Sequence, residues 1–364
     1  MKGLSLVELM IAIALSLLLT LGIIQLFQGS KVTFNTNEAL ARMQENGRFT
    51  LEILKRELRE TGTHGWCAGR VTITDHTNSC DEFPNGGNSP LMGWEFASTS
   101  DGDSYNMPAD LDPANIPAGS WSTATGTGLH QNLNGQLVPG SDFFVVRRFE
   151  PLQYTINSNS SNDRIALTAG FPITGDITLV TNCSFADLFQ QASAGGDLDK
   201  SSFACSATGP GNQTALPWST QYGVGAQVFR VQEIAYFVGF DPTRGDGVPG
   251  LYRLNLSNGI REELVEGVEN LQVRYGYSRD ATQGGDGQSV RFEEDWLTAD
   301  QVPNWRQVIA MRISMSVQSP DIADGERDAQ TFTLAGVDVT SAADGRLRQP
   351  FSTTIALRNQ IIVP

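Results

Sequence analysis

The fold is decided at the N-terminus, where residues 1–30 read MKGLSLVELMIAIALSLLLTLGIIQLFQGS. After Glu8 no charge occurs from Leu9 to Ser30, a run of 22 residues rich in Leu, Ile and Ala. As an α-helix this run would extend about 33 Å, enough to cross a hydrocarbon layer of roughly 30 Å. The sequence therefore predicts one membrane-spanning helix at the start of the chain.

Two simpler interpretations of this run are a secretory signal peptide and a plain membrane anchor. A signal peptide has an apolar core of about 7–15 residues closed by a small-residue cleavage site, whereas this run is longer and lacks such a site. Glu8 argues against a plain anchor, because a carboxylate inside a membrane helix is costly and usually functional. If the chain is cut after Gly3, the new amine of Leu4 and the Glu8 carboxylate of a neighbouring subunit can pair, which offsets their desolvation.

The segment Gly3-Leu4-Ser5-Leu6-Val7-Glu8-Leu9 resembles the class III (prepilin) signal of type IV pilins and pseudopilins. The resemblance implies that a prepilin peptidase cuts after Gly3, that Leu4 becomes the N-methylated first residue, and that Glu8 is the assembly carboxylate. The usual first mature residue in the family is Phe, and the family tolerates Leu at this position. We therefore expect a prepilin leader at 1–3 and a transmembrane, filament-core helix at 4–30.

The helical pattern continues through residues 31–61, which contain no Pro. An apolar face recurs at steps of three or four residues and consists of Leu40, Met43, Gly47, Leu51, Leu54 and Leu58. We predict one continuous or gently kinked helix from Leu4 to about Thr61, ended by Gly62 and Gly65. The alternative is two helices broken near Gly29 or Gly47. An amphipathic helix at 31–62 would then lead into a periplasmic, β-rich globular head at 63–364.

Period-two patterns in the remainder predict strands and therefore an α+β fold, with the helix packed on a mostly antiparallel sheet. The predicted strands are Phe143–Val146, Asp176–Val180, Val228–Phe240, Gly250–Leu256, Val268–Tyr277, Val308–Val317 and Phe351–Leu357. Residues 81–140 and 185–225 are rich in Gly, Ser, Asn, Pro and Thr, and we expect both to be long loops. The expected shape is that of a type IV pilin.

Four stretches resemble the PilW family of minor pilins: Asn46–Gly65, Gly259–Tyr277, Asn304–Ser319 and Arg346–Asn359. The resemblance implies a minor pilin of the type IV pilus (fimbrium), which primes pilus assembly within a tip complex and serves twitching motility and cell adhesion. The implied partners are the inner membrane, the prepilin peptidase, other minor pilins and the major pilin, with a tip adhesin as a further candidate. The alternatives are a GspJ-like pseudopilin of a type II secretion system and a membrane-anchored periplasmic binding ectodomain.

The four cysteines are Cys67, Cys80, Cys183 and Cys205. An even number in a periplasmic domain indicates disulfides, and of the three connectivities we expect the local pairs Cys67–Cys80 and Cys183–Cys205. A zinc site is the alternative, because His64-x-x-Cys67 and His76-x-x-x-Cys80 have the spacing of metal ligands. Export to an oxidising compartment favours the disulfides, so we expect no metal and no cofactor.

Composition limits the chemistry of the chain. The formal net charge of −15 opposes nucleic-acid binding, which needs basic patches. Asp-rich loops around Asp101, Asp241, Asp280 and Asp321 are candidate calcium sites, but none completes an EF-hand loop. Only three histidines occur, and His130 stands in a Gly/Asn loop without a nucleophile motif. We therefore predict a structural protein and not an enzyme.

Overall fold

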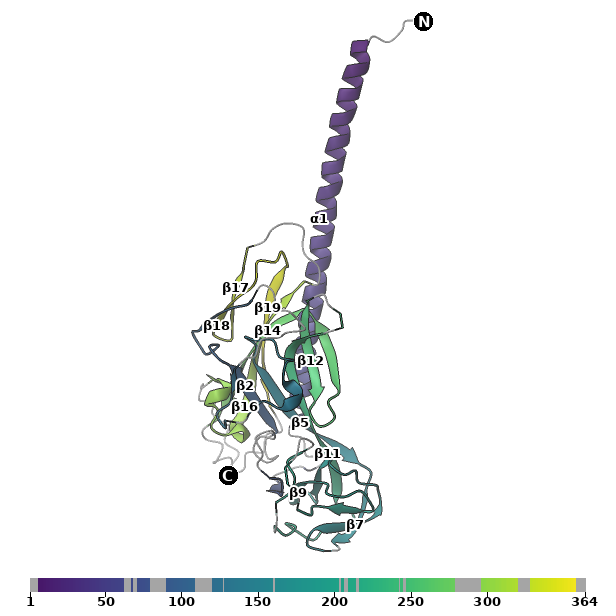
Figure 1. The fold of residues 1–364 in the computed structure, drawn as a ribbon, viewed down its shortest axis with the longest axis vertical. Helices are drawn as coiled ribbons and strands as arrows, with labels where there is room; N and C mark the ends of the chain where they lie inside the picture. Colours follow the sequence, from purple (N-terminus) through teal and green to yellow (C-terminus); the bar gives the residue numbers. More distant parts are fainter. Residues whose placement is uncertain are drawn as a thin grey trace.

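The computed structural model has the shape of a long rod on a head (Figure 1). The residues that it describes are 6–61, 67, 71–78, 90–108, 120–126, 128–159, 161–202, 204–205, 209–213, 216–241, 243–244, 247–278, 296–319 and 328–357. The rod is a single helix, α1 (Leu6–Arg59), of 54 residues. The head is built almost entirely of strands, which are mostly antiparallel, so the predicted α+β class is confirmed.

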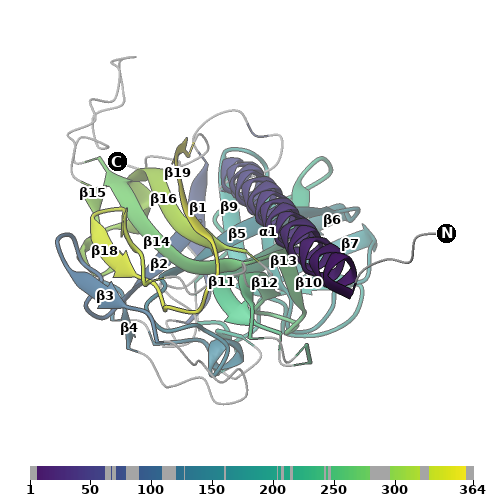
Figure 2. The ribbon, with the colours of Figure 1, turned by 90° about the horizontal axis from the view of Figure 1, so that it is seen from above.

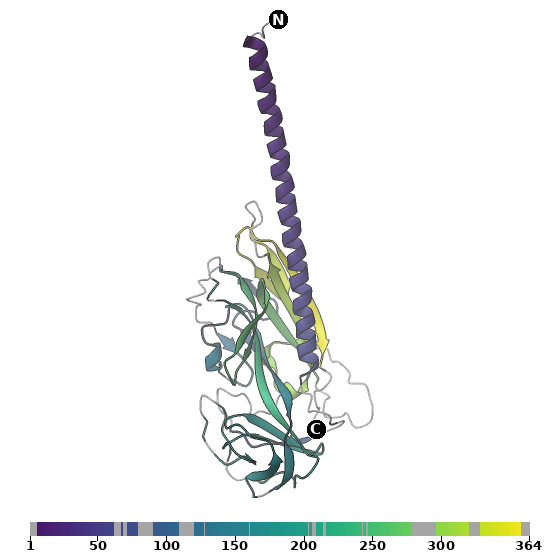
Figure 3. The same ribbon diagram turned by 90° about the vertical axis from the view of Figure 1, so that its right-hand side faces the viewer.

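Helix α1 is continuous, as predicted, and neither Gly29 nor Gly47 breaks it. Its N-terminal half stands clear of the head, and its C-terminal half buries one face against the strands (Figure 3). The buried face consists of Ala39, Met43, Gly47, Thr50, Ile53, Leu54, Glu57 and Leu58. Steps of three and four residues separate them, so they form one stripe along the helix. One continuous helix thus has an exposed N-terminal half and a C-terminal half that packs on the head.

The larger sheet has nine strands and extends through most of the head. Its main path has the order β1 (Thr72–Asp75), β9 (Phe185–Gln190), β8 (Ile177–Thr181), β11 (Gln227–Phe240), β5 (Phe143–Leu152), β2 (Leu91–Phe96) and β4 (Trp121–Ser122). Strand β12 (Pro249–Asn255) pairs with β11 and with β13 (Arg261–Glu266). The pairing of β1 with β9 is parallel, whereas the other pairs of this sheet are antiparallel.

A second, four-stranded antiparallel sheet faces the first across the core. Its order is β15 (Trp296–Leu297), β14 (Val268–Tyr277), β16 (Val308–Gln318) and β19 (Arg348–Ala356). Only Gly267 separates β13 from β14, with φ at +89°, and a Cβ atom there would lie 2.7 Å from the carbonyl oxygen of Gln318. This residue must be glycine, because it lets the chain turn from one sheet into the other at close quarters.

Two three-stranded sheets complete the head. One has the order β10 (Asp197–Asp199), β7 (Arg164–Ala169) and β6 (Thr155–Asn159), and the other β17 (Thr331–Leu334), β18 (Val337–Thr340) and β3 (Ser104–Asn106). The β6–β7–β10 sheet, with β8, β9 and the start of β11, surrounds a separate core around Trp218 and Phe189. We call this part, residues 154–228, the distal lobe, because it lies at the end of the head farthest from the N-terminus (Figure 1).

The main core lies between α1 and the two larger sheets. Helix α1 contacts β19, β13 and β16. In the view from above, β16 and β19 lie to the left of α1 (Figure 2). Large aromatic side chains fill the space between the sheets: Trp94 stacks on Phe143 with ring centroids 4.7 Å apart, and Tyr275 meets the edge of Trp305 at 4.8 Å. Such pairs add to the stabilisation that comes from the apolar area they bury.

The loop predictions for 81–140 and 185–225 are wrong in part. The first stretch contains β2, β3 and β4, and the second contains β9 and β10. Strand β2 is buried on both faces, from Leu91 to Glu95, so it shows no alternation that period two could detect. The seven predicted strands all correspond to observed strands, and the bounds of β14 are those predicted.

Two buried carboxyl groups share one arginine between the sheets. Glu95 on β2 lies 3.1 Å from Arg274 on β14, and Asp142 lies 3.9 Å from the same Arg274 nitrogen. Burial raises the pKa of Glu95, the neighbouring Asp142 raises it further, and Arg274 offsets only part of the rise. Burial also raises the pKa of Asp142, although the amides of Phe96 and Val273 donate to its carboxylate. We infer that Glu95 stays protonated in the folded head at neutral pH.

This arrangement predicts a pH dependence of stability. An unfolded glutamate loses its proton near pH 4.5, whereas folded Glu95 keeps it, so stability falls as the pH rises above that value. The loss is at most about 1.4 kcal/mol per pH unit. Glu95→Gln keeps a neutral hydrogen-bonding side chain and removes this dependence. Thermal unfolding at pH 5 and pH 8 should show a smaller drop in Tm for Glu95→Gln than for the wild type, and equal drops would contradict the assignment.

Candidate assembly interface

The exposed half of α1 is the largest apolar surface in the described part of the chain. Its large side chains are Leu6, Val7, Leu9, Met10, Ile11, Ile13, Leu15, Leu17, Leu18, Leu19, Leu21, Ile23, Ile24, Leu26, Phe27, Val32 and Phe34. Leu26 and Phe27 are 74% and 71% exposed. A water-soluble monomer does not leave so much apolar surface uncovered. By length and composition, α1 is the one helix in the described residues able to cross a membrane.

Glu8 lies in the first turn of this apolar half, with its side chain exposed and apolar residues on all sides along the helix. Glu8 directly precedes the apolar run Leu9–Ser30, and its role as the assembly carboxylate stays a prediction. Gly3 and Leu4 lie outside the described residues, so cleavage after Gly3 and N-methylation of Leu4 stay predictions. The helix that carries Glu8 has neither a kink nor a second segment, so its N-terminal end is held rigidly relative to the head.

A buried polar contact locks the base of α1 onto the sheet. Glu57 is 3% exposed on the buried face of α1, where its carboxylate accepts a hydrogen bond from the Tyr236 hydroxyl of β11 and forms an ion pair with Arg148 of β5. Burial raises the pKa of Tyr236, so its hydroxyl keeps the proton that it donates. We call Glu57, Tyr236 and Arg148 the helix latch. It fixes both the rotation and the depth of α1 on the head.

Two further contacts hold α1 a few turns earlier. The amide Nδ2 of Asn46 donates to the carbonyl oxygen of Glu266 at 3.1 Å, next to the turn between β13 and β14. Gly47 faces Phe351 of β19, and a Cβ atom at Gly47 would lie 2.3 Å from the tip of that ring. The absence of a side chain at Gly47 therefore lets β19 approach the helix backbone. With the helix latch, these contacts join α1 to both larger sheets.

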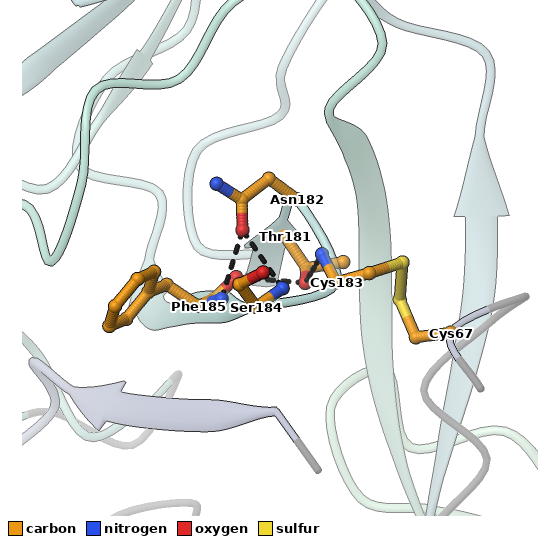
Figure 4. The surroundings of a disulfide bond; sticks show 6 residues. All are labelled: Cys67, Thr181, Asn182, Cys183, Ser184 and Phe185. Atoms are coloured by element: carbon orange, nitrogen blue, oxygen red, sulfur yellow. Dashed lines mark hydrogen bonds between the residues drawn. A yellow bond between two sulfur atoms is a disulfide. The ribbon is translucent and has the colours of Figure 1, made fainter. Parts of the chain in front are cut away.

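A disulfide connects the segment after α1 to the distal lobe. Cys67 is bonded to Cys183, with Cα atoms 5.0 Å apart and a sequence separation of 116 (Figure 4). Cys183 sits in the tight turn between β8 and β9, where the Asn182 side chain accepts from the amides of Ser184 and Phe185 (Figure 4). The disulfide therefore ties a structured turn to the chain that leaves the helix.

The expected local pairing Cys67–Cys80 and Cys183–Cys205 is wrong. The parallel pairing of β1 with β9, in which Thr72 lies opposite Phe185, places the chain before β1 beside the β8–β9 turn. Cys205 is also disulfide-bonded, and Cys80 lies outside the described residues. The zinc alternative loses a ligand, because Cys67 is not a free thiolate, and His64 lies outside the described residues. Among the described residues, no group of three or more metal-ligating side chains lies close enough together to hold a metal ion. This holds for the acidic loops at Asp101 and Asp241. Asp280 and Asp321 lie outside the described residues.

One cluster, in which His76 contacts the distal lobe, contains Ser, His and Asp, but it is not arranged as a catalytic triad. His76 Nε2 lies 2.5 Å from Asp187 Oδ1, and the hydroxyls of Ser219 and Tyr222 donate to Asp187 Oδ2. The serine therefore bonds to the carboxylate, whereas a triad needs it on the histidine. Burial opposes the ionisation of Asp187, but hydrogen bonds from His76, Ser219 and Tyr222 outweigh it and lower the pKa of Asp187. The cluster holds the lobe together.

The other histidine of interest, His130, is also structural. It is 4% exposed, and its Nδ1 accepts a hydrogen bond from the amide of Asn132 at the start of a short 3₁₀ turn. Asn132 in turn donates to the carbonyl oxygen of Leu256. His130 therefore shapes the loop that lies against β12.

The exposed apolar half of α1 fits a single membrane anchor, and the C-terminal half joins it to a β-rich head. Residues 235–359, from within β11 to just beyond β19, match the model of the PilW family, type IV pilus-assembly protein W. This part of the head is therefore similar to the PilW family, and the family points to type IV pilus assembly. No curated protein and no solved structure matches the chain.

The matched region contains most of the head residues that hold α1. Tyr236, Glu266 and Phe351 lie within 235–359, whereas Arg148 and the distal lobe precede it. Gly47 lies on the predicted apolar face of α1, whereas Glu57 was not among the predicted residues. Glu57 could have been found from its position, because it follows Leu54 by three residues. This spacing places a charged side chain on the apolar stripe of the helix.

Proposed function

We propose that this protein is a minor pilin that primes assembly of the type IV pilus as part of a tip complex. The observation that carries the proposal is the combination of a fully exposed apolar helix half, a carboxylate within its first turn, and a rigid connection to a head of the PilW family. The family concerns pilus assembly, which favours the pilus over the secretion pseudopilus. A plain anchor would require neither Glu8 nor the helix latch.

In this proposal the precursor sits in the inner membrane with its head in the periplasm. The prepilin peptidase cuts after Gly3, and Leu4 becomes the methylated N-terminus. Glu8 then pairs with the N-terminal ammonium of a neighbouring pilin, because each charge offsets the desolvation of the other in the apolar filament core. Residues 9–30 leave lipid and pack against equivalent helices of other minor pilins and the major pilin.

The rigid attachment of α1 to the head determines how the distal lobe is oriented in the filament. With the helix directed into the filament core, the distal lobe lies at the opposite end of the molecule (Figure 1). A subunit of this shape at the top of a filament would present its distal lobe outward, where a tip adhesin is the candidate partner. Because the helix latch prevents rotation of α1, the registration of Glu8 also fixes the orientation of the lobe.

The proposal predicts a specific effect of Glu8→Ala. The variant should still insert into the membrane, because removing a charge makes the apolar run more favourable in lipid. Its recovery in sheared filaments should fall roughly tenfold or more, since an unpaired buried ammonium in the core costs several kcal/mol. Quantitative immunoblotting of sheared pili and of membranes measures both pools.

Glu45→Ala is the matched control, since Glu45 is exposed on the same helix but beyond the apolar run. It should be incorporated like the wild type. Normal recovery of Glu8→Ala in sheared filaments would contradict the assembly role of Glu8.

A further inference from the structure

Strand β19 (Arg348–Ala356) forms one edge of the four-stranded sheet. It pairs with β16 on one side, and among the described residues no strand pairs with its other side. Its residues alternate between two faces: Phe351 and Ile355 lie toward α1 and the core, whereas Ser352, Thr354 and Ala356 are exposed. In the views of Figures 1 and 3, β19 runs alongside the C-terminal half of α1.

The hydrogen bonds at the two ends of the pairing show which backbone groups point outward. Leu357 N donates to Ile309 O, and Ser319 N donates to Leu347 O. In an antiparallel pair such hydrogen-bonded positions alternate with positions whose groups point away. The odd-numbered residues of β19 therefore face β16. The amide and carbonyl groups of Ser352, Thr354 and Ala356, and the carbonyl group of Pro350, face outward.

Pro350 agrees with this assignment, because proline occurs in a sheet where its missing amide is not required. The outward groups belong to exposed residues, so water reaches them. They form a row of donors and acceptors spaced two residues apart. Such a row is a template for a further strand.

Other edges in the described part of the head are shorter than β19 or charged. The edge strands β1, β4, β15, β17, β3 and β10 have two to four residues each, and the edge strand β6 has five. The edge strand β13 carries Arg261, Glu262, Glu263 and Glu266 within six residues. By contrast β19 has nine residues, and no charge occurs from Gln349 to Leu357. Charges, proline and short length are the usual protection of an edge, and beyond Arg348 and Pro350 at its start β19 has none of them.

We propose that the outer edge of β19 is a docking site for an extended, uncharged strand of a different protein chain, which adds to the four-stranded sheet beside β19. The backbone groups from Pro350 to Ala356 bind it, and its side chains alternate between the α1 side, next to Phe351 and Ile355, and the solvent side, next to Ser352 and Thr354. This kind of recognition takes its affinity from main-chain hydrogen bonds and its specificity from alternate side chains.

A second copy of this chain does not fit the edge. Symmetric pairing of two β19 strands would be antiparallel about a two-fold axis perpendicular to the strand. Because β19 runs alongside α1, this axis would turn the second α1 in the opposite direction (Figure 3). The two copies of α1 would then point in opposite directions, whereas both must enter the same membrane from the same side. The occupant is therefore a segment of another protein.

The proposal is tested in cells that express the full-length chain with a photoreactive phenylalanine analogue at Ser352, Thr354 or Ala356. Irradiation should attach each position to one segment of another protein, identified by mass spectrometry of the cross-linked peptides. Moving the probe by two residues should move the attachment point by about two residues, as in paired strands. Attachment at scattered positions, to a second copy of this chain, or to nothing would overturn the proposal.

Backbone recognition is tested by Thr354→Pro with the probe at Ala356. Proline removes the outward amide of Thr354 but leaves the hydrogen bonds to β16 in place, so cross-linking should fall roughly tenfold. Thr354→Val keeps the amide and should cross-link like the wild type. A Tm close to that of the wild type shows that both variants fold. Equal cross-linking by the folded Pro and Val variants would contradict strand addition. The result does not depend on whether the filament assembles through Glu8.

Discussion

Glu57→Ala is expected to loosen the base of α1 on the head and to lower the free energy of unfolding by about 3 kcal/mol. The loss of stability is large because the Glu57 carboxylate is the shared partner of Tyr236 and Arg148. The Tyr236 hydroxyl keeps its proton but loses its acceptor, and Arg148 loses its counter-ion. Tyr236 is fully buried, so water cannot replace the lost carboxylate without opening the core.

The measurement is urea unfolding of the full-length protein in detergent, followed by tryptophan fluorescence. Glu52→Ala is the matched control, since Glu52 is exposed on the same helix, and it should change the free energy of unfolding by less than about 0.5 kcal/mol. Limited proteolysis should cut α1 near its base faster in Glu57→Ala than in Glu52→Ala. If the two variants unfold alike, the helix latch does not hold α1.

Removing the Cys67–Cys183 disulfide by Cys67→Ser with Cys183→Ser is expected to cost about 4–5 kcal/mol. The bridge closes a loop of more than a hundred residues, and long loops lose the most chain entropy in the unfolded state when they are closed. The loss should concentrate at the distal lobe, whose β8–β9 turn is tied to the chain after α1 through this bond. The main core packs around the C-terminal half of β11, from Ile234 to Phe240, whereas the core of the distal lobe includes Val228 at the start of that strand.

Hydrogen exchange separates the two regions. In the double variant the amides of β8 and β9 should exchange much faster, whereas those of β14 and β16 should change little. A uniform change throughout the head would mean that the disulfide stabilises one cooperative unit. Unchanged protection of β8 and β9 would mean that the bond contributes no stability to the lobe.

The parts of the structure that the sequence predicted are those determined by neighbours in the chain. The apolar run Leu9–Ser30 and the stripe from Met43 to Leu58 follow from the period of the helix. The alternation of apolar and polar residues in Val308–Val317 follows from the two-residue period of a strand. Glu8 could be singled out because a charge within an apolar run has a local cost.

The parts that the sequence did not predict depend on contacts between distant residues. The bond between Cys67 and Cys183 depends on the parallel pairing of β1 with β9, which no local pattern encodes. Strand β2 was taken for a loop because burial on both faces removes its alternation. The role of Glu57 was not predicted, since its partners Tyr236 and Arg148 come from two strands far along the chain.

The mature N-terminus tests the central claim most directly. The protein should be purified from cells that assemble pili, and its N-terminal peptide analysed by mass spectrometry. The proposed function predicts a chain that begins with N-methylated Leu4, with Glu8 as its fifth residue. A mature protein that begins at Met1, with leader and anchor intact, would contradict the account and would indicate a membrane-anchored ectodomain.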